Sequence, residues 1–468
     1  MESKNEKLDQ SFRDSIATIG EDGKRAWVYA SKPNGKYYRY RTYLSYFLLF
    51  VFFTMPFIKW HGDPLFLFNI PKGRFIIFNV VFWAQDFFIF GLGMLIFILF
   101  VVVFTVVFGR IFCGWACPQT IFLEMVFRKI EFWIEGDANE QKRLDKMPWT
   151  ADKIKKRGLK LAVFFLISFL VANTFLSYII GMDELRNIIT GPFEEHIGGL
   201  ISILIFSLVF NFIFLWFREQ SCIVVCPYGR LQGVLLDRNS LMVAYDYNRG
   251  ETRGKFKKNE KREIGDCIDC HQCVKACPTG VDIRNGTQME CINCTACIDA
   301  CDHMMENVGL PKGLIRYASE NGIANKVPLK FTTRMFGYVT VLCILIGLES
   351  FLLISRTNLD VSIIRARGLL YQEQPDSINV SNIYNLKLEN KTRYEMPVTL
   401  KLESLDGQIK IIGNENIVVP KEGHSQAEFF ILLNKNKIRT RKTKLKVDIF
   451  SKDVKIKSVE TVFFGPVK

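Results

Sequence analysis

Five long apolar segments constrain the fold of this chain more than any other feature of its sequence. The clearest lies between Asp86 and Phe108 and contains "FFIFGLGMLIFILFVVVFTVVF", which holds no charged residue. About 20 apolar residues are enough to cross the ~30 Å hydrocarbon core of a bilayer as a helix. The other segments that approach this length are Tyr43–Ile58, Leu159–Ile180, Ile197–Phe217 and Met335–Ile354. The sequence therefore predicts a membrane protein with a bundle of five transmembrane helices.

Lysine and arginine are unevenly placed between these segments and predict their orientation. Met1–Thr42 and Gly109–Arg157 are rich in both residues, whereas Asp183–Glu195 holds one arginine and four acidic residues. Because cytoplasmic loops carry the excess of basic residues, we expect the N-terminus inside the cell. Five spans would then place the segment after Ser355 outside.

The formal net charge of +14 does not require a nucleic-acid partner. Much of the excess lies in the segments that are expected inside, where the membrane accounts for it. The stretch "NRGETRGKFKKNEKREIG" is typical of a solvated basic linker beside anionic lipid. We therefore expect the lipid bilayer as a partner and no nucleic acid.

A doubled cysteine run carries the strongest chemical signal. "CIDCHQCVKACP" has the spacing C-x-x-C-x-x-C-x-x-x-C-P, and "CINCTACIDAC" repeats it without the proline, which Asp302 replaces. In bacterial ferredoxins three cysteines of such a run hold one [4Fe–4S] cluster and the fourth holds the other. The sequence thus predicts two clusters with the ligand sets Cys267, Cys270, Cys273 and Cys301, and Cys291, Cys294, Cys297 and Cys277. Paired zinc sites are the alternative, but they favour two separated C-x-x-C knuckles.

The distribution of the cysteines along the chain indicates a reducing compartment. None of the 13 cysteines lies in the segment expected outside, and Cys343 is the one within the fifth apolar segment. This distribution favours thiolate ligands over disulfides. No glycine-rich nucleotide fingerprint follows a strand between Arg218 and Phe331, so we expect an external electron donor.

Two C-x-x-x-C-P pairs follow the second and fourth apolar segments. "GRIFCGWACPQT" contains Cys113 and Cys117, and "REQSCIVVCPYGR" contains Cys222 and Cys226. Thiols at i and i+4 share one face of a continuing helix, so the four could converge on copper(I), zinc or an iron–sulfur centre. Of these, copper and iron–sulfur centres can accept electrons. The alternative is four small buried residues at a crowded helix junction.

The segments "GRIFCGWACPQTIF", "REQSCIVVCPYGRLQGVLLD" and "VAYDYNRGETRG" and the doubled run, in this order, resemble the FixG/RdxA/CcoG family. These are accessory proteins of cbb-type cytochrome c oxidase. The resemblance implies a polyferredoxin of the bacterial inner membrane, with a cytoplasmic N-terminus and ferredoxin domain, which reduces Cu(II) to Cu(I) for the oxidase copper centre. It implies a copper-binding and catalytic role for Cys113, Cys117, Cys222 and Cys226.

The resemblance also implies partners: a cytoplasmic electron donor, copper ion, and oxidase assembly factors or a copper chaperone or transporter. NapH-type membrane ferredoxins, which also carry C-x-x-x-C-P pairs, are the alternative. Such a subunit would link a quinol or a cytoplasmic donor to a partner oxidoreductase.

After Ser355 the chain changes to a β pattern. "PVTLKLESLDGQIKII" alternates apolar and polar residues up to a turn at Asp406-Gly407, and "KLKVDIF" alternates again. About seven such pieces over roughly 110 residues fit an immunoglobulin-like sandwich, which the family also carries here. The expected domains are a cytoplasmic segment at 1–42, a four-helix membrane region at 43–245, a ferredoxin-like domain at 246–331, a fifth transmembrane helix at 335–354 and a periplasmic immunoglobulin-like domain at 357–468.

Two acidic residues lie in or beside apolar segments. Asp86 is at the outer border of the second segment, and Glu349 is within the fifth. Acidic side chains are costly in lipid, so both are functional candidates, although Asp86 could simply reach water.

Overall fold

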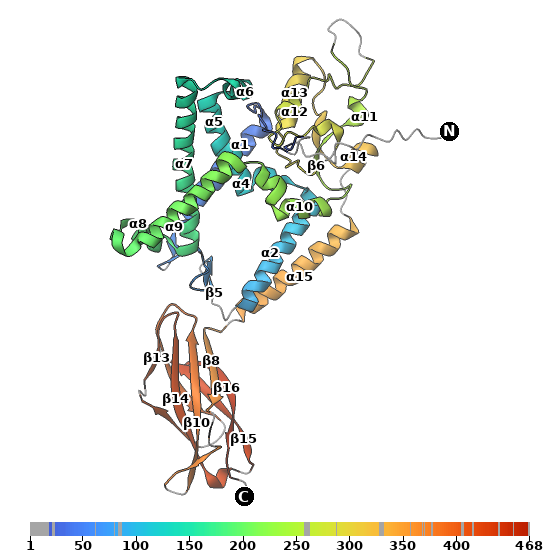
Figure 1. The fold of residues 1–468 in the computed structure, drawn as a ribbon. Helices are drawn as coiled ribbons and strands as arrows, with labels where there is room; N and C mark the ends of the chain where they lie inside the picture. Colours follow the sequence, from blue (N-terminus) through green and yellow to red (C-terminus); the bar gives the residue numbers. More distant parts are fainter. Residues whose placement is uncertain are drawn as a thin grey trace. The chain divides into compact units, whose positions relative to one another are not determined.

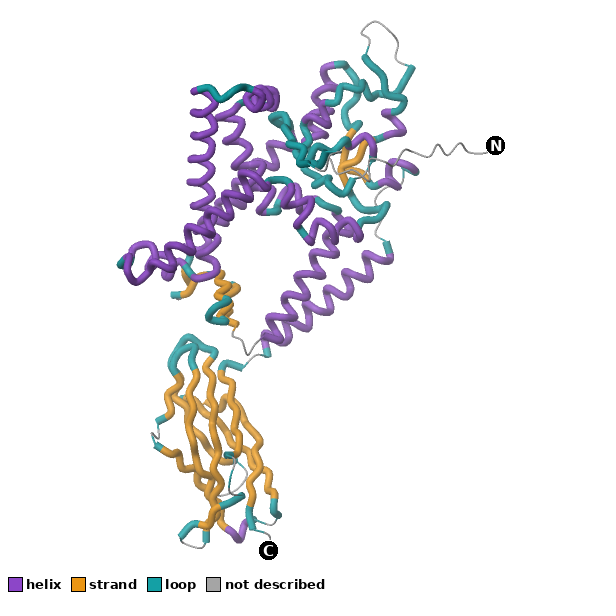
Figure 2. The backbone as a smooth tube through the Cα atoms, viewed as in Figure 1, coloured by secondary structure: helices purple, strands orange, loops and turns teal. Residues whose placement is uncertain are grey.

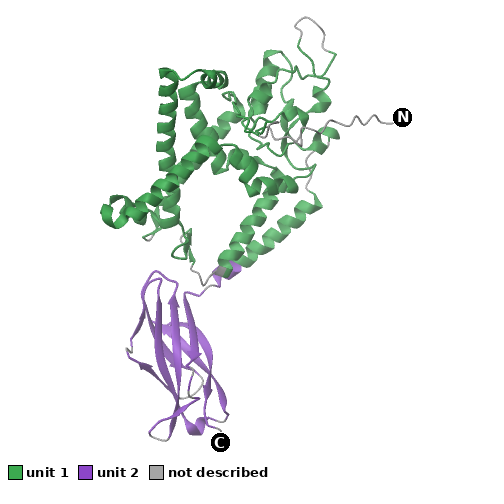
Figure 3. Ribbon diagram, in the orientation of Figure 1, with its two compact units in different colours: residues 1–349 green, residues 350–468 purple. Residues whose placement is uncertain are grey.

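The computed structural model divides the chain into two compact units, residues 1–349 and 350–468 (Figure 3). The first unit is mainly helical and the second is built from strands (Figures 1 and 2). The residues that the structure describes are 18–20, 24–60, 62–78, 80–82, 87–256, 263–286, 288–326, 332–355, 357–366, 368, 370–375, 378–403, 407–413, 416–438, 440–452 and 454–466.

Among the described residues, four helices are long and apolar enough to cross a membrane. They are α2 (Phe87–Phe108), α7 (Ala151–Ile180), α9 (Phe193–Phe212) with its π-helical continuation η5 (Ile213–Phe217), and α15 (Thr333–Ile354). The expectation of five such spans is therefore wrong by one. The expected first span is a helix, α1 (Lys36–Thr54), but Arg39 and Arg41 in its first turns leave an uncharged stretch much shorter than ~20 residues.

Helix α1 nevertheless connects the cysteine subdomain to the last turns of α7. At its start, the backbone N–H groups of Tyr37 and Tyr38 donate to the carboxylate of Asp299 in the second cysteine run. Near its end, the carbonyl of Phe52 accepts a hydrogen bond of 2.8 Å from the hydroxyl of Tyr178, in the last turns of α7. Packing rather than hydropathy thus keeps α1 beside the apolar helices.

Two of the apolar helices begin at least one turn earlier than expected. Helix α7 begins at Ala151 rather than at Leu159, because the side chain of Thr150 caps it by accepting from the N–H of Lys153. Helix α9 begins at Phe193, with two glutamates in its first turn. Charged first turns of this kind extend a helix beyond its apolar stretch.

Short helices connect α2 to α7. They are α3 (Ile111–Trp115), α4 (Pro118–Thr120), the π-helix η4 (Ile121–Phe127), α5 (Arg128–Glu135) and α6 (Ala138–Lys146). After α9, the π-helix η6 (Ser221–Val225) and α10 (Pro227–Leu235) follow. An aromatic stack joins the first of these groups to the end of the α9 helix, since the ring centroids of Phe127 in η4 and Phe214 in η5 are 4.5 Å apart.

The other ends of these helices carry small elements. After the 3-10 turn η2 (Met55–Phe57) come the strands β1 (Lys59–Trp60), β2 (Asp63–Pro64), β3 (Phe66–Asn69), β4 (Arg74–Ile77) and β5 (Val80–Phe82). The helix α8 (Met182–Thr190) joins α7 to α9. An ion pair of 2.6 Å between Lys59 and Asp183 links the two connections.

The cysteine runs lie in a subdomain closed by one pair of strands. Strand β6 (Met242–Tyr245) pairs antiparallel with β7 (Ile315–Ala318), so the subdomain begins just before the expected boundary at residue 246. Between the strands lie α11 (Tyr247–Gly250), α12 (Gln272–Lys275), the 3-10 turn η7 (Ile283–Asn285) and α13 (Ala296–Asn307), and α14 (Glu320–Ala324) follows β7.

The second unit is a sandwich of two antiparallel sheets, as expected. One sheet has the order β12-β14-β10-β8, with β9 beside β10, and the other has the order β13-β11-β15-β16. The strands are β8 (Leu359–Arg365), β9 (Gln372–Glu373), β10 (Asn379–Asn390), β11 (Met396–Leu402), β12 (Gly407–Ile412), β13 (Ile417–Val419), β14 (His424–Asn434), β15 (Lys442–Ser451) and β16 (Val454–Phe464). The expected turn lies between β11 and β12, which belong to different sheets; Asp406 is outside the described residues.

Candidate metal centres

The two cysteine runs share one backbone conformation. In the first run, Asp269 and His271 flank the middle cysteine with left-handed φ angles of 54° and 56°. In the second run, Asn293 and Thr295 occupy the same positions with φ angles of 53° and 66°. Residues other than glycine adopt this conformation at a cost, and such residues cluster at functional sites. Left-handed residues also help to gather backbone N–H groups into concavities that bind anions, including iron–sulfur clusters.

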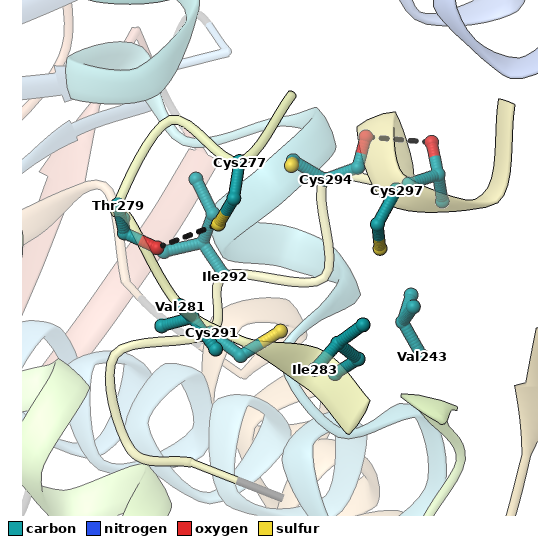
Figure 4. Close-up of a pocket in the computed structure, with 10 residues that line it drawn as sticks. Val243, Cys277, Thr279, Val281, Ile283, Cys291, Ile292, Cys294 and Cys297 are labelled. Carbon is teal, nitrogen blue, oxygen red and sulfur yellow. Dashed lines mark hydrogen bonds between the residues drawn. The ribbon is translucent and has the colours of Figure 1, made fainter. Parts of the chain in front are cut away.

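The second run contributes to a cavity with an empty volume of about 340 Å³. Figure 4 shows the sulfur atoms of four cysteines around this common space. The lining residues are Val243, Cys277, Thr279, Val281, Ile283, Cys291, Ile292, Cys294, Thr295 and Cys297. The cavity therefore joins three cysteines of the second run to the fourth cysteine of the first.

The first run forms a matching cavity of about 330 Å³. Its lining residues are Tyr245, Cys267, Ile268, Cys270, His271, Cys273, Arg284, Cys301, Met305, Leu314 and Ile315. Here the first run contributes three cysteines and the second run contributes Cys301. Both groups of four are the sets that the spacing predicts, and their role as ligands stays a prediction.

The chemistry of both cavities suits a cluster with several metal ions. Burial raises the pKa of Cys273, Cys291 and Cys301 to about 12, so these thiols need a nearby positive charge to become thiolates. Within the described part of the chain, no three His, Cys, Asp or Glu side chains converge closely enough to hold one metal ion. The cysteines instead surround a space, which fits a [4Fe–4S] cluster better than a single zinc ion.

The expectation that each C-x-x-x-C-P pair lies on one continuing helix is wrong. Helix α3 ends at Trp115, and Cys117 has the extended angles φ −62° and ψ 125° as the N-cap of α4. In the second pair, η6 ends at Val225 and Cys226 is the N-cap of α10, with φ −64° and ψ 110°. The proline after each cysteine is the cause, because it disfavours a helical residue before it and starts a new helix.

These four cysteines, which we call the border quartet, still gather in one place. They are Cys113, Cys117, Cys222 and Cys226. Burial raises the pKa of Cys113 to about 12, and the charge of the neighbouring Cys117 acts in the same direction. Burial likewise raises the pKa of Cys222 to about 12, and Cys117 and Cys113 add to the effect. The four thiols are thus within electrostatic reach of one another, although no three of them converge closely enough in this structure to hold one metal ion.

The border quartet lies directly against the second-run cavity. A Cβ atom placed on Gly114, next to Cys113, would be 2.5 Å from the carbonyl oxygen of Ile292, next to Cys291. A Cβ on Gly109, whose φ is +58°, would be 2.3 Å from the carbonyl oxygen of Leu241. Glycine at both positions allows two backbones to touch. Helix α3 and the second cysteine run are therefore in van der Waals contact.

Three buried polar side chains at this contact were missed by the sequence reasoning. Arg41 donates to the carbonyls of Gly114, at 2.6 Å, and Cys294, at 3.4 Å. Arg110 donates to the carbonyls of Met289, Cys291 and Gly229. Gln232 accepts a hydrogen bond of 3.2 Å from the thiol of Cys113. The sequence does indicate one of them, since Arg110 is a charged residue at the end of an apolar span, where charged residues are often functional.

The other singled-out residues lie elsewhere. Glu349 is on α15, where its Oε1 lies 3.4 Å from the position that a Cβ on Gly93 of α2 would take, and its Oε2 is buried without a hydrogen-bond partner. Cys343 is exposed on the same helix. Asp86 lies outside the described residues. The structure brings neither Glu349 nor Cys343 to the cysteine sites.

Comparisons with known proteins agree with this architecture. Residues 217–320 match the family model of a 4Fe–4S dicluster domain, residues 90–136 that of a 4Fe–4S binding domain, and residues 350–466 that of the IG-like fold at the C-terminal of FixG. Protein RdxB of Cereibacter sphaeroides is 32% identical over 420 residues, which cover 86% of this chain and 85% of RdxB.

Two further relatives extend the match. Protein RdxA of Cereibacter sphaeroides is 34% identical over 387 residues, which cover 79% of this chain and 81% of RdxA. The nitrogen fixation protein FixG of Rhizobium meliloti is 33% identical over 321 residues, which cover 65% of this chain and 60% of FixG. The apolar helices and the iron–sulfur domains together define a membrane-associated iron–sulfur electron-transfer protein. The chain belongs to the FixG/RdxA family.

Proposed function

We propose that this protein reduces Cu(II) to Cu(I) at the border quartet, for the assembly of cbb-type cytochrome c oxidase. The observation that carries the proposal is the contact between the quartet and the second-run cavity, where the backbone of Gly114 meets that of Ile292. Soft thiolates favour Cu(I), so binding at the quartet would stabilise the reduced product relative to Cu(II). The reaction consumes one electron for each copper ion, which an external donor supplies.

In this proposal the two cavities hold [4Fe–4S] clusters, which supply one-electron redox chemistry when bound. Cys267, Cys270, Cys273 and Cys301 hold one, and Cys277, Cys291, Cys294 and Cys297 hold the other. The chain's own residues then have two roles. The left-handed residues of each run shape the cradle, and the glycines of the α2–α3 corner bring the quartet against it.

We place the protein in a bacterial inner membrane. The N-terminus and the ferredoxin subdomain lie on its cytoplasmic side, and the sandwich lies on its periplasmic side. The basic segments 24–42 and 109–157 support this orientation. Four crossings would return the chain to the side on which it began, so this placement requires that α1, whose two ends contact Asp299 and Tyr178, also lies across the membrane. The sandwich would then be free to bind an oxidase assembly factor or a copper chaperone or transporter. A reporter fused after Lys468 tests this: activity in the cytoplasm would contradict it.

A second candidate is an electron relay to a partner oxidoreductase, as in NapH-type ferredoxins. One observation favours it: the match of residues 90–136 to a 4Fe–4S binding domain includes Cys113 and Cys117. In that case the quartet would hold iron and sulfide instead of copper.

Metal analysis of the full-length protein separates the two candidates. After anaerobic purification, the protein is incubated with Cu(II), washed and analysed for copper and iron, and formation of Cu(I) by the prereduced protein is followed with a chromogenic Cu(I) chelator. Copper reduction requires copper at the quartet and about eight irons per chain, about four for each cluster. About twelve irons and no copper would favour the relay. Cys343→Ser, which removes the exposed thiol of α15, is the matched control.

A further inference from the structure

Two arginines lie between the second-run cavity and the border quartet. Arg41 is 3% exposed and Arg110 is 5% exposed, so both guanidinium groups are removed from water. All of the hydrogen bonds described for them go to backbone carbonyls, those of Gly114 and Cys294 for Arg41 and those of Met289, Cys291 and Gly229 for Arg110. One nitrogen of each, Nη2 of Arg41 and Nε of Arg110, is buried without a partner.

No carboxylate among the described residues forms an ion pair with either arginine. The nearby Asp299 accepts from the backbone N–H groups of Tyr37 and Tyr38, and Glu124 is paired with Arg128 at 3.3 Å. A buried charge without a counter-charge is strongly destabilising, so such a pair of cations persists only beside an anion. The neighbouring groups that can become anionic are the cysteines.

Both arginines are bonded to the backbone of the second run. Arg41 donates to the carbonyl of Cys294 at 3.4 Å, and Arg110 donates to the carbonyl of Cys291 at 3.5 Å. Both of these cysteines line the second-run cavity. The two guanidinium groups therefore lie beside the proposed cluster ligands.

The first-run cavity has a different environment. Its arginine, Arg284, is also buried, but two carboxylates neutralise it: Asp282 at 2.6 Å and Asp269 at 2.5 Å. His271 contacts it as well, at 2.8 Å. The two cavities thus share the same cysteine pattern and the same backbone, yet differ in local charge. The first has a compensated arginine and the second has two uncompensated ones.

We propose that Arg41 and Arg110 are the counter-charges of the cluster in the second-run cavity and set its reduction potential above that of the cluster in the first-run cavity. A cluster held by four thiolates is a net anion, and it becomes more negative when it accepts an electron. Nearby positive charge therefore stabilises the reduced state, and net charge and hydrogen bonding are known determinants of cluster potential. Both arginines are positioning residues rather than catalytic residues. The inference rests on the ligand sets of the proposed function.

The test uses the full-length protein, purified without oxygen and titrated with dithionite while the clusters are followed by electron paramagnetic resonance. Cys270→Ser leaves the second-run cluster alone, and Cys294→Ser leaves the first-run cluster alone. In the Cys270→Ser background, Arg110→Gln and Arg41→Gln should each lower the ratio of reduced to oxidised cluster about tenfold at a fixed potential, which is about 59 mV for a one-electron couple. In the Cys294→Ser background the same two substitutions should shift the reduction potential of the first-run cluster much less.

Two controls separate charge from structure. Arg110→Lys keeps the charge but loses the forked hydrogen bonds, so the potential should stay closer to that of the unchanged protein than in Arg110→Gln. Arg238→Gln removes an exposed arginine after α10 and should leave both potentials unchanged.

The outcomes are distinguishable. If Cys270→Ser or Cys294→Ser retains the full iron content, the ligand sets and the proposed function fail. If each retains one cluster but the glutamine variants shift neither potential, or shift both equally, only the role of the arginines is overturned. A lysine variant that behaves like the glutamine variant would also overturn it, because the effect would then come from packing.

Discussion

The two kinds of cysteine site in this protein are built in different ways. The cysteines of the runs lie on loops with paired left-handed residues and on the helices α12 and α13 that follow these loops, and each group of four lines one cavity. The border quartet instead lies at helix ends, where two cysteines are N-caps of new helices. A cradle of strained backbone suits a resident group, and the border quartet has no such cradle.

The difference shows that cysteine spacing predicts a site only when it also determines the backbone. The run spacing C-x-x-C-x-x-C forces a tight loop, so the partners of each cysteine follow from the sequence. The spacing C-x-x-x-C-P leaves the relative placement of two distant pairs open, and tertiary contacts decide it.

The largest effect should come from removing one cysteine of a run. Cys294→Ser replaces a thiolate in the second-run cavity by a hydroxyl, which is a poor ligand for iron. We expect the iron content to fall from about eight to about four per chain, with the loss of one reducible couple. Iron and labile sulfide assays on anaerobic protein measure this. Full retention of iron would show that Cys294 is not a cluster ligand, and the proposed difference between the runs and the border quartet would then fail.

Removing a border pair should have a narrower effect. Cys222→Ser combined with Cys226→Ser, or Cys113→Ser combined with Cys117→Ser, should abolish copper binding and Cu(II) reduction. Both clusters should remain, because the run cavities contain neither pair. Copper and iron analysis together with the Cu(I) assay gives the answer. Variants that still bind and reduce copper would show that the four cysteines of the quartet are packing residues without a role in copper chemistry.

A smaller effect is expected where the two sites touch. Gly114→Ala would place a methyl group 2.5 Å from the carbonyl oxygen of Ile292, so the two backbones must separate. Overpacking of this kind costs about 1–3 kcal/mol. We expect a lower thermal unfolding temperature and slower Cu(II) reduction at unchanged iron content. Gly337→Ala on α15 has no neighbour within 4 Å and is the control. Equal behaviour of the two variants would contradict the close contact.

The smallest effect should be confined to the sandwich. Tyr384→Phe removes the hydrogen bond of 2.9 Å from the tyrosine hydroxyl to the carbonyl of Val462. The loss should cost about 1 kcal/mol locally. Faster hydrogen exchange in β10 and β16 of the full-length protein, with normal iron content and copper reduction, is the expected result. A fall in iron content or in the rate of copper reduction would contradict the expectation that the effect is confined to the sandwich.

Much of the fold could be predicted because apolar length and β alternation are local signals. The positions of α2, α9 and α15 and the two-sheet sandwich follow from them. The position of α1 does not follow from them, because Arg39 and Arg41 lower its hydropathy while hydrogen bonds with Tyr178 and Asp299 fix its place. The position of that helix is thus determined by tertiary contacts rather than by its hydropathy.

The candidate site was predictable to the same degree. The grouping of the run cysteines follows from their spacing, but the partners of Arg110 do not. It contacts Gly229 and Met289, which are 119 and 179 residues further along the chain. The proline after Cys117 and Cys226 was recognised as a break, yet its effect on the cysteine before it was not. Steric restriction of the residue before proline explains that difference.

The bond between α1 and Asp299 has a consequence for biogenesis. The N–H groups in the first turn of a helix need partners, and here Tyr37 and Tyr38 find theirs in a side chain that is synthesised about 260 residues later. Asp299 lies between Cys297 and Cys301, so its position depends on the folding of both runs. The capping of α1 is thus completed only after the cysteine subdomain has formed. A chain in which this subdomain has not folded would leave the start of α1 uncapped, so the folding of the two parts is coupled although they are far apart in the sequence.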